Sequence, residues 1–316
     1  MADKHEAAQI LAADPAGIAA AAAALRDGGI VALPTETVYG LAARSDHAES
    51  VAAIYRAKGR PDFNPLIVHV PSLTAAKALA RFDSRAEQLA AAFWPGALTL
   101  VLPLRAEAVI APAVTAGLPT IALRCPAHPV MRAVLDACGL PLAAPSANRS
   151  GGVSPTQAGH VAASLGAAAP LILDGGACAA GLESTIIALR EDGSWQVLRP
   201  GPIDAAQVAA ILGSPPEAVT SAAIEAPGQL ASHYAPGKPV RLNAGSAAPD
   251  EFLIGFGPVA GDLSLSPNGD LAEAAARLYA ALHAAAAALQ PRIAVAPVPA
   301  EGMGVAINDR LARAAA

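Results

Sequence analysis

The chain has 316 residues and a net charge of −5, so it is long enough for two domains with a sizeable core. An acidic chain does not hold RNA or DNA through its overall field, and any anionic ligand must meet a local cluster of cations. The 54% hydrophobic content owes much to alanine, and only 3% of residues are aromatic. A core of Leu, Val, Ile and Ala suits helices packed on a sheet.

The cysteines and the amino-terminal segment bear on the cellular compartment of the protein. Cys125, Cys138 and Cys178 include no Cys-x-x-Cys pair, which predicts buried thiols and argues against a disulfide framework or a zinc site. Acidic residues precede the alanine run 19–24, and Asp14 begins a helix pattern, so no signal peptide is indicated. No stretch is long and apolar enough to span a bilayer. We therefore predict a cytoplasmic protein without membrane association.

The first predicted elements are a helix over 15–26, a buried strand over 30–33, a helix over 48–57 and a strand over 65–70. The distance between the two strands leaves room for one crossover helix, so we predict a βαβ unit. The hydroxyl-rich turn 34–37 follows the first strand. Loops at the carboxyl ends of strands carry ligand chemistry in α/β sheets, which makes this turn a candidate binding loop.

A short cationic segment, Lys58-Gly59-Arg60, follows the second helix and precedes the second strand. We expect it to form a tight polar loop, since glycine and proline end the helical pattern there. Two interpretations remain open from the spacing alone. The segment is either a surface loop with two solvated cations or part of an anion site.

The rest of the first domain alternates helices and strands. Further helices are predicted at 72–82, 84–93, 129–138, 156–165 and 204–212, and further strands at 97–102, 119–123, 141–144, 171–174, 184–189 and 195–198. This order predicts an α/β fold.

A second domain is predicted after a linker. Residues 213–238 are rich in Pro, Ser, Ala and Gly and have the composition of a flexible tether, interrupted by His233-Tyr234. We therefore divide the chain into a first domain over 1–212, a linker over 213–238 and a small α/β domain over 239–316. The last domain is predicted to contain strands at 252–256 and 292–295, a helix over 271–289 and a final helix from about 305.

Several nucleotide and metal motifs are absent. Gly237-Lys238 precedes Pro239, so no P-loop is present, and neither a Gly-x-Gly-x-x-Gly fingerprint nor His-Glu-x-x-His occurs. What remains is a set of cations and polar side chains at predicted strand or helix ends: Lys58, Arg60, Arg124, Ser146, Asn148, Ser184 and Arg199. Each alone is more often a solvated group or a turn residue. Together on one rim of the sheet they could neutralise a polyphosphate.

Four segments of the chain together resemble the YrdC-domain family. They are Pro34-Thr-Glu-Thr-Val-Tyr-Gly-Leu41, Lys58-Gly-Arg60, Asn64-Pro-Leu-Ile-Val-His69 and Ser146-Ala-Asn148, and the family's mark is Lys-x-Arg followed by Ser-x-Asn. This resemblance covers roughly residues 25–211. The patch 233–236 and the segment 302–311 resemble the linker and second domain of the family's long form. The implied fold is a YrdC-like domain with a twisted mixed sheet, a linker and a small Rossmann-like α/β domain.

The resemblance implies a nucleotidyltransferase that joins L-threonine, bicarbonate and ATP into threonylcarbamoyl-AMP, with release of pyrophosphate. The product would pass to the machinery that makes threonylcarbamoyladenosine in tRNA. Carried over by position, Thr35, His69, Arg124 and Ser184 would surround threonine. The ATP-binding set would be Lys58, Arg60, Thr120, Ser146, Asn148, Ser154, Arg199 and Tyr234. Mg²⁺ would accompany ATP, held chiefly by the phosphates without a protein metal site.

Two other functions remain open: a double-stranded RNA-binding module, and a carbamoyltransferase related to hydrogenase maturation. The acidic balance argues against the first, and the lack of Cys-x-x-Cys argues against the second; direct binding of tRNA stays undecided. For the linker, Tyr234 either closes over bound ATP as a lid or pins the linker to the first domain. The string 227–232 departs from the family's longer basic and aromatic linker, which bears on this choice.

Overall fold

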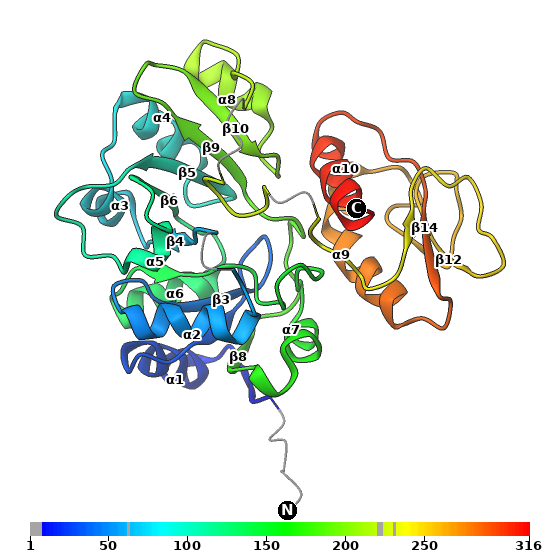
Figure 1. The fold of residues 1–316 in the computed structure, drawn as a ribbon, viewed down its shortest axis with the longest axis horizontal. Helices are drawn as coiled ribbons and strands as arrows, with labels where there is room; N and C mark the ends of the chain where they lie inside the picture. Colours follow the sequence, from blue (N-terminus) through cyan, green and yellow to red (C-terminus); the bar gives the residue numbers. More distant parts are fainter. Residues whose placement is uncertain (1–7, 62–63, 220–223, 230–231) are drawn as a thin grey trace, which may run out of the picture.

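A computed structural model describes residues 8–61, 64–219, 224–229 and 232–316. The described residues form two sheets, one of ten strands and one of four, each with its own helices (Figure 1). The first sheet belongs to the amino-terminal two thirds of the chain and the second to the carboxyl-terminal part. The predicted α/β fold is confirmed.

The large sheet is mixed. Neighbouring strands run parallel in some pairs, such as β4 with β6, and antiparallel in others, such as β5 with β6. In spatial order the strands are β1 (Ile10–Ala12), β8 (Leu171–Asp174), β2 (Val31–Leu33), β3 (Gly40–Arg44), β7 (Leu142–Ala143), β4 (Ile67–His69), β6 (Thr120–Arg124), β5 (Leu98–Pro103), β9 (Thr185–Leu189) and β10 (Trp195–Arg199).

The predicted βαβ unit is wrong. Strand β3 lies between β2 and the helix, pairs antiparallel with β2, and together with β7 separates β2 from β4. The strand escaped prediction because its sequence, Gly-Leu-Ala-Ala-Arg, contains residues with little preference for strands. The turn 34–37 nevertheless follows the carboxyl end of β2, as predicted.

Alanine-rich helices cover this sheet. They are α1 (Pro15–Arg26), α2 (Ala48–Lys58), α3 (Leu73–Leu79), α4 (Ser84–Phe93), the short α5 (Pro112–Thr115), α6 (Pro129–Cys138), α7 (Ala158–Leu165) with a 3₁₀ turn (Gly166–Ala168), and α8 (Ala205–Leu212). Helices α1 and α6 enclose one apolar cluster with Leu33 and Leu142, and a larger cluster around Leu41, Val68 and Leu100 fills the other side. Close packing of small side chains thus fixes the sheet edge that carries the polar residues.

The second sheet is parallel, with the order β11 (Val240–Arg241), β14 (Arg292–Val295), β12 (Glu251–Gly255) and β13 (Leu263–Ser264). Helices α9 (Leu271–Ala287) and α10 (Met303–Ala314) lie between this sheet and the first domain (Figure 1). His283 on α9 stacks on His160 on α7, with ring centroids 4.0 Å apart. Among the described residues, no helix is both long and apolar enough to cross a membrane.

Part of the described linker is packed against the rest of the chain, whereas residues 213–219 are exposed. Ala226 is fully buried and Tyr234 is 1% exposed. Ser214 accepts a hydrogen bond from the Trp195 indole, so the start of the linker is also attached to the first domain. Residues 220–223 and 230–231 of the linker lie outside the described residues. In the described segments of the linker, the chain is irregular and is anchored at Ser214, Ala226 and Tyr234.

Candidate functional site

Most of the predicted binding residues meet at one edge of the large sheet. Strands β4 and β6 end there, and their last residues, His69 and Arg124, are register partners. Strands β5 and β9 begin at the same edge. The edge forms a hollow of about 540 Å³, which includes space open to solvent. It is lined by Thr35, Thr37, Val38, Gly40, Arg60, Ile67, His69, Arg124, Ala144, Pro145, Ser146, Glu183, Ser184, Arg199, Pro227, Gly228, His233 and Tyr234.

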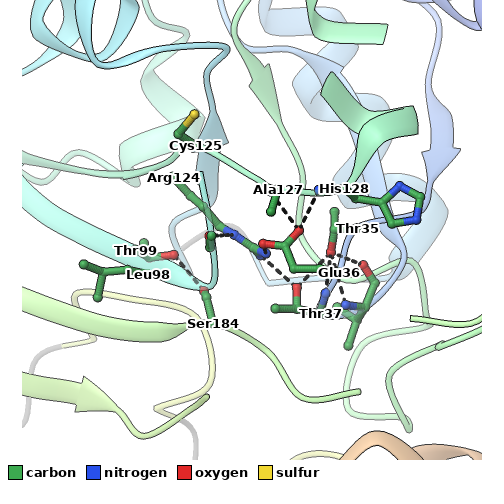
Figure 2. Close-up of polar contacts among 12 residues, drawn as sticks. Thr35, Glu36, Thr37, Leu98, Thr99, Arg124, Cys125, Ala127, His128 and Ser184 are labelled. Atoms are coloured by element: carbon green, nitrogen blue, oxygen red, sulfur yellow. Dashed lines mark hydrogen bonds and ion pairs between the residues drawn. The ribbon is translucent and has the colours of Figure 1, made fainter. Parts of the chain in front are cut away.

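Arg124 is held in place by three neighbours (Figure 2). Its Nε donates to the Gly96 carbonyl at 3.1 Å, Nη1 to Thr37 Oγ1 at 2.8 Å, and Nη2 to Glu36 Oε1 at 2.6 Å. The side chain is 4% exposed. A guanidinium fixed in this way presents its remaining N–H groups in a set direction, which suits recognition of a carboxylate.

The hydroxyl-rich turn forms a chain of hydrogen bonds behind Arg124. Thr35 Oγ1 donates its one proton to the Val38 carbonyl at 2.6 Å. The two threonine hydroxyls are 2.8 Å apart, and Thr35 Oγ1 also accepts from the amides of Thr37 and Val38. The chain runs from Arg124 through Thr37 and Thr35 to a backbone carbonyl.

A second arginine approaches the same hollow from β10. Arg199 is 4% exposed and donates from Nε and Nη2 to the Ser184 carbonyl, and from Nη2 to Ser184 Oγ at 3.1 Å. Ser184 Oγ also contacts Thr99 Oγ1 at 2.7 Å (Figure 2). Burial lowers the pKa of Arg199 from its ordinary value. Ser184, predicted for threonine, and Arg199, predicted for ATP, are thus direct neighbours.

Lys58 departs from the expected polar loop. It is the last residue of α2, is only 3% exposed, and its Nζ donates to the carbonyls of Ser146 and Asn148 at 2.5 Å each. Burial, with a smaller contribution from nearby Arg60, places the pKa of Lys58 well below its usual value. The surface-loop interpretation is wrong for this residue. Through these two hydrogen bonds, Lys58 attaches the loop Ser146-Ala147-Asn148 to the end of α2. It does not line the hollow.

Arg60 is also buried, but it faces the hollow. Its Nη2 donates to the Pro65 carbonyl at 3.0 Å, and burial lowers its pKa to about 10. Buried polar atoms without a hydrogen-bond partner among the described residues include Asn64 Oδ1, His69 Nδ1, Asn148 Oδ1 and His233 Nδ1. Burial also lowers the pKa of His69 to about 3 and that of His233 to about 4, so both imidazoles are neutral near pH 7. Unpaired buried groups of this kind are costly unless a ligand or water satisfies them.

Glu183 of the first domain lines the hollow and is contacted by two side chains of the second domain. This carboxylate accepts hydrogen bonds from Ser154 Oγ, from the Tyr279 hydroxyl at 2.8 Å and from Arg310 Nε at 2.9 Å. Burial would raise the pKa of Glu183, but the charges of Arg310 and Arg199 outweigh it and lower that pKa to about 2. Arg310 also lies over the ring of Tyr234, 5.3 Å from its centroid. One buried ion pair therefore links the first domain, the linker and α10.

Four predicted residues do not line the hollow. Lys58 and Asn148 lie behind its wall, and Asn148 Nδ2 donates to the carbonyls of Arg149 and Gly152. Ser154 contacts Glu183 from the far side. Thr120 begins β6, at the opposite end of that strand from Arg124. The structure thus brings the threonine set together completely and the ATP set in part.

Sequence reasoning missed the residues that hold this site together. Glu36, Thr37 and Thr99 support Arg124 and Ser184, and Glu183 and Arg310 connect the domains. Glu36 and Glu183 carried one available signal, since each is an acidic residue next to a predicted binding residue, Thr35 or Ser184. Arg310 belongs to the segment 302–311 that carries the resemblance, but it lies on a helix more than a hundred residues from Glu183, so its partner could not be named from the sequence.

Hydrogen exchange tests whether the linker closes only on a ligand. The His233 amide donates to the Arg313 carbonyl at 3.2 Å, and the Ala235 amide donates to the Gly151 carbonyl at 2.8 Å. These bonds and the burial of Tyr234 attach the linker to both domains, so we expect both amides to exchange slowly whether or not a ligand is bound. Exchange should be followed over 232–236 with and without ATP and L-threonine. Fast exchange that slows only when both are added would instead identify a lid.

Two family models together match most of the chain. A family model for Sua5, YciO and YrdC proteins, described as "Telomere recombination", matches residues 23–201. A model described as "Threonylcarbamoyl-AMP synthase, C-terminal domain" matches residues 203–316. Threonylcarbamoyl-AMP synthase of Bacillus subtilis is 40% identical over 324 aligned positions, which cover 94% of this chain and 92% of that protein.

Two further comparisons are with Pyrococcus abyssi. A protein named threonylcarbamoyl-AMP synthase is 43% identical over 224 positions, covering 68% of this chain and 64% of its own length. The crystal structure of Sua5 from this organism, complexed with L-threonine, superimposes with a TM-score of 0.87 at 34% identity and covers 97% of both chains. The chain belongs to the Sua5/YciO/YrdC family and carries the additional carboxyl-terminal domain found in threonylcarbamoyl-AMP synthases.

Proposed function

We propose that this protein is a threonylcarbamoyl-AMP synthase, which forms threonylcarbamoyl-AMP and pyrophosphate from L-threonine, bicarbonate and ATP. One observation carries the proposal: Arg60, Arg124 and Arg199 converge on one hollow, whose only lining carboxylate among the described residues is Glu183. That carboxylate is already paired with Arg310. Arg124 is paired with Glu36, whereas no ion pair is found for Arg60 or Arg199 among the described residues. The hollow therefore keeps positive charge at Arg60 and Arg199, which a polyphosphate would neutralise.

The two substrates divide the hollow between them in this proposal. Threonine binds near Thr35, His69, Arg124 and Ser184, with its carboxylate on Arg124. ATP binds on the side of Arg60, Ser146, Arg199 and Tyr234, while Lys58, Asn148 and Ser154 support that side from behind. Thr120 stays assigned to ATP by resemblance alone. Since Ser184 touches Arg199 at 3.1 Å, the amino acid and the nucleotide would meet there.

The chemistry needs positioning and charge neutralisation more than acid–base catalysis. The amine of threonine takes up bicarbonate to give a carbamate, with loss of water. A carbamate oxygen then attacks the α-phosphorus of ATP, and pyrophosphate leaves with the electron pair of the broken P–O bond. Arginines fixed by backbone carbonyls stabilise the added negative charge without having to reorganise. A neutral His69 can hydrogen-bond to threonine but carries no proton to give at pH 7.

We infer that Mg²⁺ enters with ATP. Phosphate oxygens are the hard ligands that Mg²⁺ prefers, and the ion usually keeps several waters. The donors of the hollow are cations, hydroxyls and amides, and Glu183 is engaged by three other groups. In the part of the chain that the structure describes, no three His, Cys, Asp or Glu residues are grouped as metal ligands. Any protein contact to the ion would come through single oxygens such as Ser146.

The proposed activity has a direct assay. Purified protein should release pyrophosphate from ATP only when L-threonine and bicarbonate are both present. Pyrophosphate release that ignores threonine would contradict the proposal. Salt-sensitive retention of tRNA on a filter, without this activity, would favour the RNA-binding alternative. Transfer of a carbamoyl group without threonine would favour the carbamoyltransferase alternative.

Valine should be a poor substrate. Its side chain has the shape of threonine but no hydroxyl, so a buried group that pairs with that hydroxyl would be left without a partner. His69 Nδ1, buried and unpaired in the described structure, is a candidate for that group. We expect kcat/KM for valine to be lower than for threonine by roughly a hundredfold or more. Equal ATP turnover with the two amino acids would show that the threonine assignment is wrong.

The cellular setting follows from the proposed reaction. We propose a first, catalytic domain over 1–212, a linker over 213–238 and a second domain over 239–316, which supplies Arg310 and Tyr279 to the shared interface. The product would be consumed by the machinery that modifies tRNA. The three cysteines are buried free thiols, which accords with a reducing cytoplasm.

A further inference from the structure

Glu36 is a partly buried acid at the site that does not line the hollow. Its Oε1 accepts from Arg124 Nη2 at 2.6 Å. Its Oε2 accepts from the amides of Ala127 and His128 at 3.1 and 3.2 Å, where the chain enters α6 (Figure 2). The side chain is 16% exposed. The carboxylate is thus fixed between a guanidinium on one side and two backbone donors on the other.

This arrangement determines what Arg124 has left to offer a ligand. A guanidinium has five N–H donors in a rigid plane. Hydrogen bonds within the described structure use three of them, with Gly96, Thr37 and Glu36 as acceptors. One N–H therefore remains on each Nη. A carboxylate that binds an arginine through both of its oxygens requires two N–H donors.

The charge state of Glu36 indicates that its contact with Arg124 is maintained at neutral pH. Burial would raise its pKa, but Arg124 and the backbone donors outweigh burial and lower that pKa from its ordinary value. Glu36 is therefore ionised at neutral pH. Turning into the hollow would break both backbone hydrogen bonds as well as the ion pair, so the geometry favours a fixed group over a mobile one.

We propose that Glu36 is a positioning residue for the substrate amino acid: it orients Arg124 so that the two uncommitted N–H groups receive the α-carboxylate. This inference deepens the proposed function and rests on it. Arg124 touches the substrate, and Glu36 acts only through Arg124. The fixed neighbour selects one orientation of the guanidinium in advance, so binding does not have to pay the entropy of ordering a free arginine.

Glu36→Gln tests this role. Glutamine can still accept from Arg124, but its NH₂ group replaces the oxygen that faces the amides of Ala127 and His128, so donors would face donors. We expect the Kd for L-threonine, measured by calorimetry on the full chain, to rise about ten- to a hundredfold. The KM for ATP should change by less than about twofold, since no ATP contact is altered. Glu49→Gln, at an exposed acid on α2 that is paired with Arg56, is the matched control and should leave both constants unchanged.

A double-mutant cycle with Arg124→Ala separates this role from a general structural one. If Glu36 acts through Arg124, Glu36→Gln should add less than about twofold to the threonine Kd once Arg124 is gone. Equal effects of Glu36→Gln in both backgrounds, or no effect in either, would overturn the inference. Normal threonine binding by Arg124→Ala would instead overturn the proposed threonine site. Should Glu36→Gln fail to fold, Glu36→Asp permits the same cycle, because it keeps the charge but cannot reach both sets of partners.

Discussion

Arg310→Met is expected to lower the free energy of unfolding by about 3–5 kcal/mol, because it leaves a buried carboxylate without its main counter-charge. Arg310 is 0% exposed and Glu183 is 8% exposed by side chain, and they are 2.9 Å apart. The guanidinium also donates to the Pro200 carbonyl and lies over Tyr234, so its loss removes contacts with the first domain and the linker together. Activity should fall with stability, since Glu183 lines the hollow and accepts from Ser154.

The pH dependence of stability gives this prediction a second measurement. In the parent protein the pKa of Glu183 falls to about 2 from an ordinary value of 4.5, despite the opposing effect of burial. Its contribution is therefore complete above pH 4.5 and is lost as the pH falls towards 2. In Arg310→Met the largest interaction that lowers this pKa is absent. The variant should therefore lose less free energy of unfolding than the parent as the pH falls through this range. The difference in stability should narrow between neutral pH and about pH 3.

Two controls make the result specific. Arg277→Met removes an exposed ion pair on α9, where Arg277 lies 3.0 Å from Glu273, and should cost no more than about 1 kcal/mol. Arg310→Met combined with Glu183→Gln removes the buried charge itself and should recover part of the loss. Urea unfolding at both pH values measures all the variants. An Arg310→Met variant as stable as Arg277→Met would show that the interdomain pair contributes little.

The local elements were largely predictable because each leaves a local pattern. Helix α6 and strands β8 and β14 begin and end at the predicted residues, since apolar periodicity and flanking turn residues mark them. Strand β3 was missed because alanine and glycine give no strand signal. The order of strands in the sheet was not predictable, because pairing such as β5 with β9 depends on contacts between residues far apart in the chain.

The site divides in the same way. Residues that would touch a ligand, such as Arg124 and Ser184, lie beside strand ends and could be named from the sequence. Their supports could not, because the partners of Glu183 and Ser184 come from distant elements, Arg310 on α10 and Thr99 on β5. The burial of individual side chains was also not predictable from the sequence. A lysine before Gly-Arg-Pro has the local pattern of an exposed loop, and only packing of α2 against the Ser-x-Asn loop makes Lys58 interior.

That burial changes what Lys58→Met should do. A solvated lysine could be removed without affecting the fold, but Nζ of Lys58 donates to the carbonyls of Ser146 and Asn148. We expect the free energy of unfolding to fall by about 1–3 kcal/mol, since two backbone carbonyls lose their hydrogen-bond donor. The KM for ATP should rise about ten- to a hundredfold, because the loop that carries Ser146 loses its anchor and the hollow loses a nearby cation.

Proton uptake distinguishes an electrostatic role of Lys58 from a purely structural one. Burial and Arg60 hold its pKa well below the usual value in the free protein, and the phosphates of ATP would raise it again. At a pH near or above this lowered pKa, ATP binding by the parent should therefore take up protons, seen as a binding enthalpy that depends on the ionisation enthalpy of the buffer, and Lys58→Met should lose this dependence. Lys77→Met, at an exposed lysine paired with Glu87, is the matched control and should keep it. If Lys58→Met loses stability but binds ATP with unchanged affinity and proton uptake, Lys58 supports the loop and plays no part in holding the nucleotide.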